Sequence, residues 1–215
     1  MTDRAFTQGF SLEGKSACLV GCGGLGCNIS VHLVGAGIER LVICDFDTVS
    51  ESNLNRQFVY TKKDIAKPKT ECMKRFLDSF GETKIEAHNI NIKSQSDLEF
   101  AKSCDVVLLA VDNSDARQIV AEFCDNNDIP MVFGGIDGFY GMAYLYIPKV
   151  SPPPAIDGDG AKHNVSCTAG IIGSAQAALA IQYLITKDID LSGNLLVYDR
   201  DTFDTLSINK KTNSP

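Results

Sequence analysis

The stretch SACLVGCGGLGCNISVHLV, residues 16–34, decides the fold of this chain. It opens with a short apolar run that predicts a buried strand, and the pattern G-x-G-x-x-G follows at Gly21, Gly23 and Gly26. A helix is predicted over about 25–34, directly at these glycines. Glycines in this setting permit a tight turn and let backbone N–H groups reach a phosphate at the helix N-terminus. We therefore expect a nucleotide-binding loop; the alternative is that the glycines only close a turn.

Strand-like and helix-like segments alternate along the rest of the chain. The predicted strands are 40–45, 84–90, 105–112 and 130–136, and the predicted helices are about 67–80, 97–101 and 114–127. Such alternation predicts an α/β fold with a doubly wound, mainly parallel, Rossmann-like sheet. The segments FYGMAYLYIP, NLLVYDR and FDTLSIN predict antiparallel strands added in the C-terminal half. Between them, the apolar run 168–185 predicts a buried helix rather than a membrane span.

Length and composition predict one domain over residues 1–215, with a flexible Pro- and Gly-rich loop at about 150–165. The hydrophobic content of 44% is enough for a substantial core. A net charge of −7 and the absence of basic runs disfavour nucleic acid or an anionic membrane as a partner. The N-terminus MTDRAFTQGF lacks the apolar run of a signal peptide, so we expect a cytoplasmic protein.

The eight cysteines lie mostly in apolar segments, where reduced core thiols are common. No two of them have C-x-x-C spacing, and the three histidines are dispersed. We therefore expect reduced cysteines and no zinc site.

A polar segment, DFDTVSESNLNRQF (45–58), follows the second predicted strand. Asp45 ends that strand, where a carboxylate can accept hydrogen bonds from ribose hydroxyls. NAD is the default owner of such a pattern, but a dehydrogenase has no use for the amide of Asn53 and the guanidinium of Arg56 here. A triphosphate needs donors along its whole length, and Lys69 offers a second cation. The segment therefore favours ATP over NAD; the alternative is that both cations are ordinary surface charges.

Four motifs together resemble one known family. They are G-C-G-G-L-G from Gly21, D-F-D-T-V-S-E-S-N-L-N-R-Q from Asp45, K-P-K ending at Lys69, and V-D-N from Val111 with Arg117 a few residues on. They resemble the sulfur-carrier adenylyltransferases of the ThiF, MoeB and HesA type, which act in thiamine and molybdopterin biosynthesis and are relatives of the ubiquitin-activating enzymes. The resemblance extends over nearly the whole chain.

This resemblance implies an ATP site, used with Mg²⁺, in a nucleotide-binding half of about 10–136, and a carrier-binding half of about 137–209. The residues it implies at ATP are Gly21, Gly23, Gly24, Gly26, Asp45, Asp47, Asn53, Arg56, Gln57 and Lys69. Within this set Asp45 would hold the ribose, and the last four would bind the triphosphate. Asp112, at the end of the predicted strand 105–112, falls where the family places its magnesium-binding, catalytically required aspartate. Asp47 is open: it supports Arg56 or the loop, or it caps the turn.

The implied reaction is attack of a C-terminal glycine carboxylate on the α-phosphate of ATP. The carboxylate belongs to a small ubiquitin-like sulfur-carrier protein that ends in Gly-Gly. With a pKa near roughly 3.5 it is already ionised at neutral pH, so no general base is required. The difficulty is repulsion between anions, which Arg56, Lys69 and Mg²⁺ on Asp112 would offset; these three residues are the predicted catalytic groups. We also expect a homodimer.

Two further residues stay open. Many relatives place an arginine near the N-terminus that reaches into a partner subunit's site, and Arg4 is the only candidate here. Cys167 precedes the long apolar helix, and a helix N-terminus lowers the pKa of a thiol. Some relatives use a cysteine in this region for a persulfide or thioester step; the alternative is a capping or packing role.

Other functions compete with carrier adenylylation. Within the fold, the rivals are ATP-dependent dehydration of a carboxylate on a modified tRNA base and adenylation of a short peptide; the acidic net charge argues against the tRNA substrate. From other classes, the rivals are an NAD(P) oxidoreductase and a scaffold that binds a carrier without chemistry. An oxidoreductase would bind reduced cofactor and would not exchange ATP with pyrophosphate.

Overall fold

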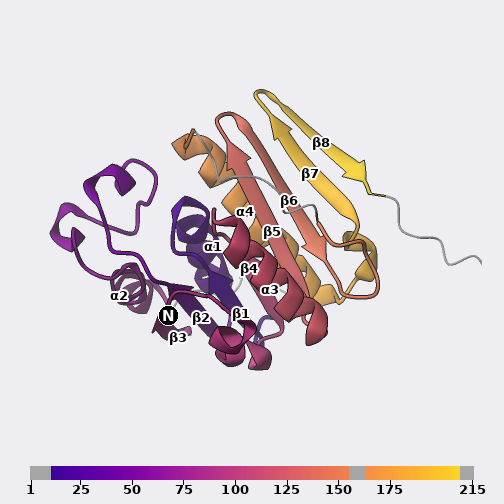
Figure 1. Ribbon diagram of the computed structural model, residues 1–215, viewed down its shortest axis with the longest axis horizontal. Coiled ribbons are helices and arrows are strands. Elements are labelled where there is room, and N and C mark those ends of the chain that lie inside the picture. Colours follow the sequence, from indigo (N-terminus) through magenta and orange to yellow (C-terminus); the bar gives the residue numbers. More distant parts are fainter. Residues whose placement is uncertain (1–10, 155–162, 209–215) are drawn as a thin grey trace, which may run out of the picture.

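A computed structural model describes residues 11–154 and 163–208, which form one eight-stranded sheet with helices on both faces (Figure 1). The strands are β1 (Ser16–Val20), β2 (Arg40–Asp45), β3 (Lys84–Asn89), β4 (Val106–Leu109), β5 (Met131–Asp137), β6 (Tyr140–Tyr146), β7 (Asn194–Asp199) and β8 (Thr202–Ser207). The α-helices are α1 (Gly24–Gly35), α2 (Lys69–Phe80), α3 (Ser114–Asn126) and α4 (Ser166–Thr186). Short 3₁₀ helices are η2 (Glu51–Asn53), η3 (Lys62–Asp64), η4 (Gln95–Ser103) and η5 (Ile189–Leu191).

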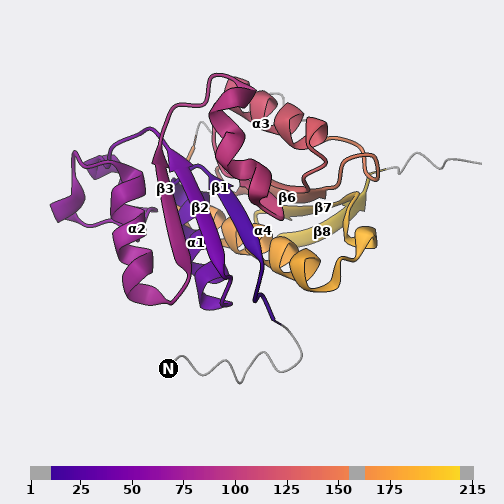
Figure 2. The ribbon, with the colours of Figure 1, turned by 90° about the horizontal axis from the view of Figure 1, so that it is seen from below.

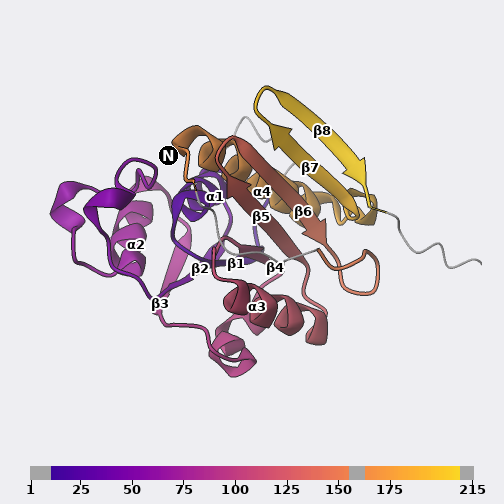
Figure 3. The same ribbon diagram turned by 45° about the horizontal axis from the view of Figure 1, so that its top comes forward.

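The strand order is β3-β2-β1-β4-β5-β6-β7-β8. Strands β1 to β5 pair in parallel, with the connection from β3 crossing back to place β4 beside β1. The last three strands pair antiparallel: β6 forms a hairpin with β5, and β7, which follows α4, forms a hairpin with β8. Strand β8 forms the far edge, with all six of its residues exposed (Figure 3). This topology confirms the predicted doubly wound, mainly parallel sheet with antiparallel strands added at the C-terminal end.

Helices α1, α2 and α4 cover one face of the sheet, and α3 with η4 covers the other (Figure 2). Alternate residues of β1 belong to opposite faces: Ala17 and Leu19 pack with the first group of helices, and Cys18 and Val20 with the second. All four are at most 1% exposed. Burial on both faces is what covered parallel strands require, and it explains why this strand is apolar throughout.

The long apolar helix α4 lies against α1 and the sheet. Its length and composition alone would allow a membrane span, yet 56% of its most apolar window is buried inside the fold. Gly173 permits a close approach to α1, because a Cβ at this position would lie 2.8 Å from Leu25 O. Helix α4 therefore packs in the core, as the sequence predicted. The expected absence of a membrane partner stays a prediction.

Two elements differ in their bounds from the expected ones. The segment predicted as a helix near 97–101 is part of a nine-residue 3₁₀ helix, η4. The strand predicted over 105–112 is shorter, because β4 ends at Leu109 and the chain then leaves the ladder. The predicted flexible loop at 150–165 lies partly outside the described residues, and Arg4 lies wholly outside them. Both expectations stay predictions.

Candidate functional site

A cavity of about 430 Å³ opens at the carboxyl ends of β1, β2 and β4. It lies at the switch point where the chain order of the strands reverses, the usual place for a ligand in a doubly wound sheet. Its volume falls within the range of about 300–1,000 Å³ typical of small-molecule sites. The predicted site residues that line it are Gly21, Gly23, Gly24, Asp45, Asp47, Asn53, Arg56, Gln57, Lys69 and Asp112.

The glycine loop joins β1 to α1 under tight steric limits. Gly21 has a φ of +104°, and a Cβ there would lie 2.5 Å from Ala110 O on the neighbouring β4 connection. Gly26 does not line the cavity; a Cβ at this position would lie 2.1 Å from Gly21 O. The missing Cβ of Gly26 therefore allows close packing of α1 against the loop, and its predicted role at the nucleotide stays a prediction.

The N-terminus of α1 faces the cavity without a side-chain cap, because Gly23 occupies the N-cap position. Unpaired N–H groups and the helix dipole make such an end a binding site for an anion. Asp45 holds the loop in place: its carboxylate accepts hydrogen bonds from Cys22 N–H at 2.7 Å and Asp47 N–H at 2.8 Å. Asp45 thus joins the glycine loop to the turn after β2.

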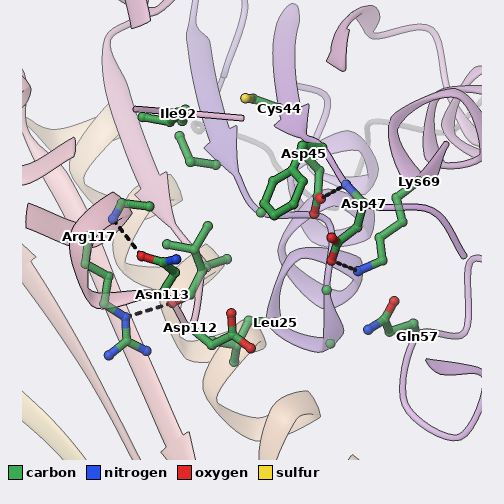
Figure 4. Close-up of a pocket in the computed structure, with 18 of the residues that line it drawn as sticks. Leu25, Cys44, Asp45, Asp47, Gln57, Lys69, Ile92, Asp112, Asn113 and Arg117 are labelled. Atoms are coloured by element: carbon green, nitrogen blue, oxygen red, sulfur yellow. Dashed lines mark hydrogen bonds and ion pairs between the residues drawn. The ribbon is translucent and has the colours of Figure 1, made fainter. Parts of the chain in front are cut away.

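Lys69 enters the cavity from the first turn of α2. Its Nζ lies 2.8 Å from Asp47 Oδ2, and the two residues are also joined by the hydrogen bond from Lys69 N–H to Asp47 O at 2.9 Å. Only 6% of Lys69 is exposed, whereas the side chain of Asp47 is 49% exposed. Asp47 therefore supports Lys69 and the turn, rather than Arg56. Figure 4 shows this pair on the opposite side of the cavity from Asp112 and Arg117.

The segment between β2 and α2 supplies two amides and a guanidinium to the cavity, those of Asn53, Gln57 and Arg56. Gln57 is 3% exposed, and its buried Oε1 has no hydrogen-bond partner among the described residues. Arg56 runs beside the glycine loop, since a Cβ at Gly24 would lie 3.5 Å from Arg56 Cγ. Its Nη1 donates to Ser52 O at 3.0 Å, within its own turn. The Oδ1 of Asn53 accepts from a backbone N–H of the η2 capping box, so this side chain also shapes the turn.

The loop after β4 carries Asp112, which is exposed and lines the cavity three residues beyond the strand. Arg117 lines the cavity as well, although in the sequence it was named only as part of a motif and was given no role at the site. Its Nε donates to Val111 O at 2.8 Å, and its guanidinium lies 5.6 Å from the Phe133 ring centroid. Burial lowers the pKa of Arg117, and the nearby Asp112 opposes that effect. Arg117 therefore braces the loop and adds a third cation to the cavity.

An apolar wall between β2 and β4 completes the cavity, and sequence reasoning did not find it. It includes Val20, Cys44, Ile90 and Ile92. Such a wall suits the flat apolar faces of a nucleobase. Burial raises the pKa of the Cys44 thiol to about 12, so this cysteine packs as an apolar group and is not a nucleophile.

Cys167 is not among the residues that line the cavity, although Asn164, three residues before it, is. It is exposed in the first turn of α4, where the sequence had placed it just before the helix. The other seven cysteines are buried and free. Within residues 11–154 and 163–208, no group of three histidine, cysteine or acidic side chains is placed to hold a metal ion. The expected lack of zinc in the whole protein stays a prediction.

Comparisons with known proteins agree with this geometry. A family model described as the ThiF family matches residues 10–215. The chain is 30% identical over 214 residues to an adenylyltransferase and sulfurtransferase MOCS3 of Aedes aegypti, covering 93% of this chain and 49% of that protein. It is 29% identical over 223 residues to a sulfur carrier protein adenylyltransferase of Thermus thermophilus, covering 95% of this chain and 82% of that protein.

Solved structures share the fold. The structure of Escherichia coli MccB with ATP superposes with a TM-score of 0.81 at 20% identity, covering 99% of this chain and 67% of MccB. A second MccB structure, with AMPCPP and the peptide MccA, gives 0.83 at 19% identity, with the same coverage of both chains. The chain spans about half the length of the MOCS3 relatives that it matches, 45–49% of their residues.

Proposed function

This chain belongs to the ThiF family, and we propose that it uses ATP to adenylylate the C-terminal glycine carboxylate of a ubiquitin-like sulfur-carrier protein. The products are an acyl-adenylate and pyrophosphate. One observation carries the proposal: the cavity joins an uncapped helix N-terminus to Arg56, Lys69 and Arg117. This concentration of positive charge around one cavity suits a triphosphate.

The chain's own residues would divide the work by position. Asp45 and the apolar wall would orient the nucleoside, while the α1 N-terminus and Lys69 would hold the phosphates. Asp112 would hold Mg²⁺, because it presents an exposed carboxylate across the cavity from Lys69. Mg²⁺, when bound, would offset the charge of the pyrophosphate leaving group.

No base is needed for this reaction, since the attacking carboxylate is already ionised at neutral pH. What the site must supply is attraction for charge that collects on the leaving group, from donors fixed before the reaction begins. Lys69 and Gln57 are suited to this, because both are nearly fully buried and so lose little freedom on binding. The adenylate would form by positioning and electrostatics alone.

The carrier is proposed from the relatives' names. The Thermus thermophilus relative is named for sulfur-carrier adenylylation, and it is covered over 82% of its length. Carriers of the thiamine type and of the molybdopterin type would both present a C-terminal glycine to this cavity. We further propose that the protein is a cytoplasmic homodimer, and that Cys167 is not needed for adenylate formation because it lies outside the cavity.

ATP–pyrophosphate exchange, measured with a panel of small Gly-Gly-terminated proteins from the same genome, tests the proposal. We expect exchange that depends on one such carrier, and a loss of about 10²–10³ in rate for Arg56→Ala or Asp112→Asn. Both variants should keep the parental melting temperature, because both residues lie at the cavity edge rather than in the core.

Two matched controls separate site charge from general charge. Asp115→Asn removes an exposed carboxylate from the first turn of α3, three residues after Asp112, and Lys63→Ala removes an exposed cation from η3; neither residue lines the cavity. Both controls should exchange pyrophosphate at the parental rate. If Arg56→Ala and Asp112→Asn also do so, adenylylation does not occur at this site, and the carrier-binding scaffold becomes the better hypothesis. Binding of NAD in place of ATP would favour the oxidoreductase.

A further inference from the structure

Tyr60 lies behind the cavity wall and is bonded to the glycine loop. It is 4% exposed, and its hydroxyl donates to the backbone carbonyl of Cys22 at 2.7 Å. Neither residue lines the cavity, whereas the next residue, Gly23, does. The bond therefore reaches the phosphate-binding loop from the core side.

Peptide geometry turns this contact into a statement about the cavity. The Cys22 carbonyl and the Gly23 N–H belong to one peptide unit, which is trans like every other peptide bond described here. In a planar trans peptide the two groups point in opposite directions. A carbonyl held toward Tyr60 in the core therefore directs the Gly23 N–H away from the core, on the side of the cavity. Among the described residues this N–H has no hydrogen-bond acceptor.

The neighbouring peptide unit is held as well. Cys22 N–H donates to Asp45 at 2.7 Å, so both groups of Cys22 that could rotate are bonded. Gly21 and Gly23 on either side have no Cβ to limit rotation, and a glycine-flanked peptide turns over easily. Among the described residues the Tyr60 hydroxyl is the hydrogen-bond donor to the Cys22 carbonyl, while the buried Cys22 side chain, whose Sγ lies 3.9 Å from Cys44 O, restrains the rest of the residue.

Tyr60 also belongs to the segment that carries the proposed phosphate ligands. Its N–H donates to Gln57 O at 3.1 Å, and Gln57 N–H in turn donates to Asn53 O at 2.9 Å. The hydroxyl bond thus fastens this run of turns onto the glycine loop. Gln57 ends up beside the loop, since a Cβ at Gly23 would lie 3.9 Å from its Nε2.

We propose that Tyr60 is a positioning residue for phosphate binding: its hydroxyl sets the direction of the Gly23 N–H and joins the two phosphate-binding segments. This inference rests on the proposed use of ATP. Burial raises the pKa of Tyr60 far above neutrality, so the hydroxyl remains a donor throughout the working pH range. Tyr60 touches no substrate and acts only through the loop that it holds.

The test compares Tyr60→Phe with the parent by titration calorimetry, using Mg·ATP and adenosine as ligands. The ring that packs in the core stays, and only the donor is lost. We expect ATP affinity to fall about tenfold, the effect of one charge-assisted hydrogen bond. Adenosine affinity should not change, because adenosine carries no phosphate. In pyrophosphate exchange, the ATP concentration for half-saturation should rise about tenfold, while the rate at saturating ATP is retained.

Tyr144→Phe is the matched control. Tyr144 is fully buried, its hydroxyl donates to Pro152 O at 2.7 Å, and neither residue lines the cavity. It should lower the melting temperature as Tyr60→Phe does and leave ATP affinity unchanged. Equal ATP affinity in Tyr60→Phe and the parent would overturn the inference, and so would equal weakening of ATP and adenosine. If the parent protein binds Mg·ATP no more tightly than adenosine, the proposed function is overturned, and the inference with it.

Discussion

Lys69 can have two anionic partners, Asp47 and a triphosphate, and Asp47→Asn separates them. In the nucleotide-free chain the ammonium of Lys69 is 2.8 Å from Asp47 and only 6% of the residue is exposed. A nearly buried ammonium that loses its carboxylate is costly, because the protein solvates it less well than water does. An asparagine keeps the shape of the side chain and removes the charge. We expect Asp47→Asn to destabilise the nucleotide-free protein and to strengthen ATP binding.

The magnitude follows from the unequal exposure of the pair. Removing one partner of a fully buried pair costs about 3–5 kcal/mol, and an exposed pair contributes about 0–1 kcal/mol. Because the side chain of Asp47 is 49% exposed, we place this pair between the two limits, at about 1–2 kcal/mol. When ATP supplies the counter-charge, the loss is recovered on binding. ATP should therefore bind the variant about 5- to 30-fold more tightly than the parent.

Thermal melts with and without Mg·ATP, together with calorimetric ATP affinities, provide the assay. Without nucleotide, Asp47→Asn should melt about 2–8 °C below the parent, and saturating ATP should narrow that gap. The control is Asp78→Asn, which breaks a more exposed pair with Lys74 on α2, at 3.0 Å, and should change neither quantity measurably. Weaker ATP binding by Asp47→Asn would refute the reasoning, because it would mean that Asp47 itself contacts the nucleotide or its metal.

Two further predictions concern stability. Gly134→Ala should lower the free energy of unfolding by about 1–3 kcal/mol, because a Cβ at this position would lie 2.2 Å from the fully buried Gln176. Gly135→Ala is the control and should cost far less, because a Cβ at Gly135 has no neighbour closer than 3.6 Å. Thermal or urea unfolding measures both. Hydrogen bonds from Arg40 hold the pKa of Glu86 at about 2, below its ordinary 4.5, so Glu86 stabilises the fold above pH 4.5 and loses that effect as the pH falls toward 2. After allowance for solvent at this 30% exposed side chain, Glu86→Gln should cost about 1–2 kcal/mol at pH 7, and urea unfolding at pH 3 should show a smaller difference from the parent; an equal difference at both pH values would contradict the assignment.

Local pattern predicted most of the element boundaries. The strand expected at 40–45 is observed with the same bounds, and the helix expected over 114–127 ends one residue earlier. The strand expected over 105–112 is longer than the observed strand. Apolar residues continue to Val111, but the strand pairing ends at Leu109. At this point the chain passes close to the glycine loop, since a Cβ at Gly21 would lie 2.5 Å from Ala110 O. Such a contact has no local signature.

The candidate site divides in the same way. Motif spacing brought together ten residues that do line one cavity, since the ends of parallel strands meet at one edge of a sheet. Spacing did not show that the missing Cβ of Gly26 allows close helix packing, and it did not weigh Arg117 as a site residue. It could not reveal that Tyr60 bonds the glycine loop, because a side chain 38 residues away reaches it only through the fold.

The amino-acid sequence by itself determined the order of strands and helices, the glycine loop and the family to which the chain belongs. These depend on backbone preference, hydrophobic period and short motifs, which neighbouring residues decide among themselves. Tertiary structure alone decided that Lys69 pairs with Asp47, that Cys167 stands outside the cavity and that the Cys22 carbonyl faces the core. Each of these depends on the distance and direction between groups far apart in the chain, and only the packing of helices on the sheet sets those.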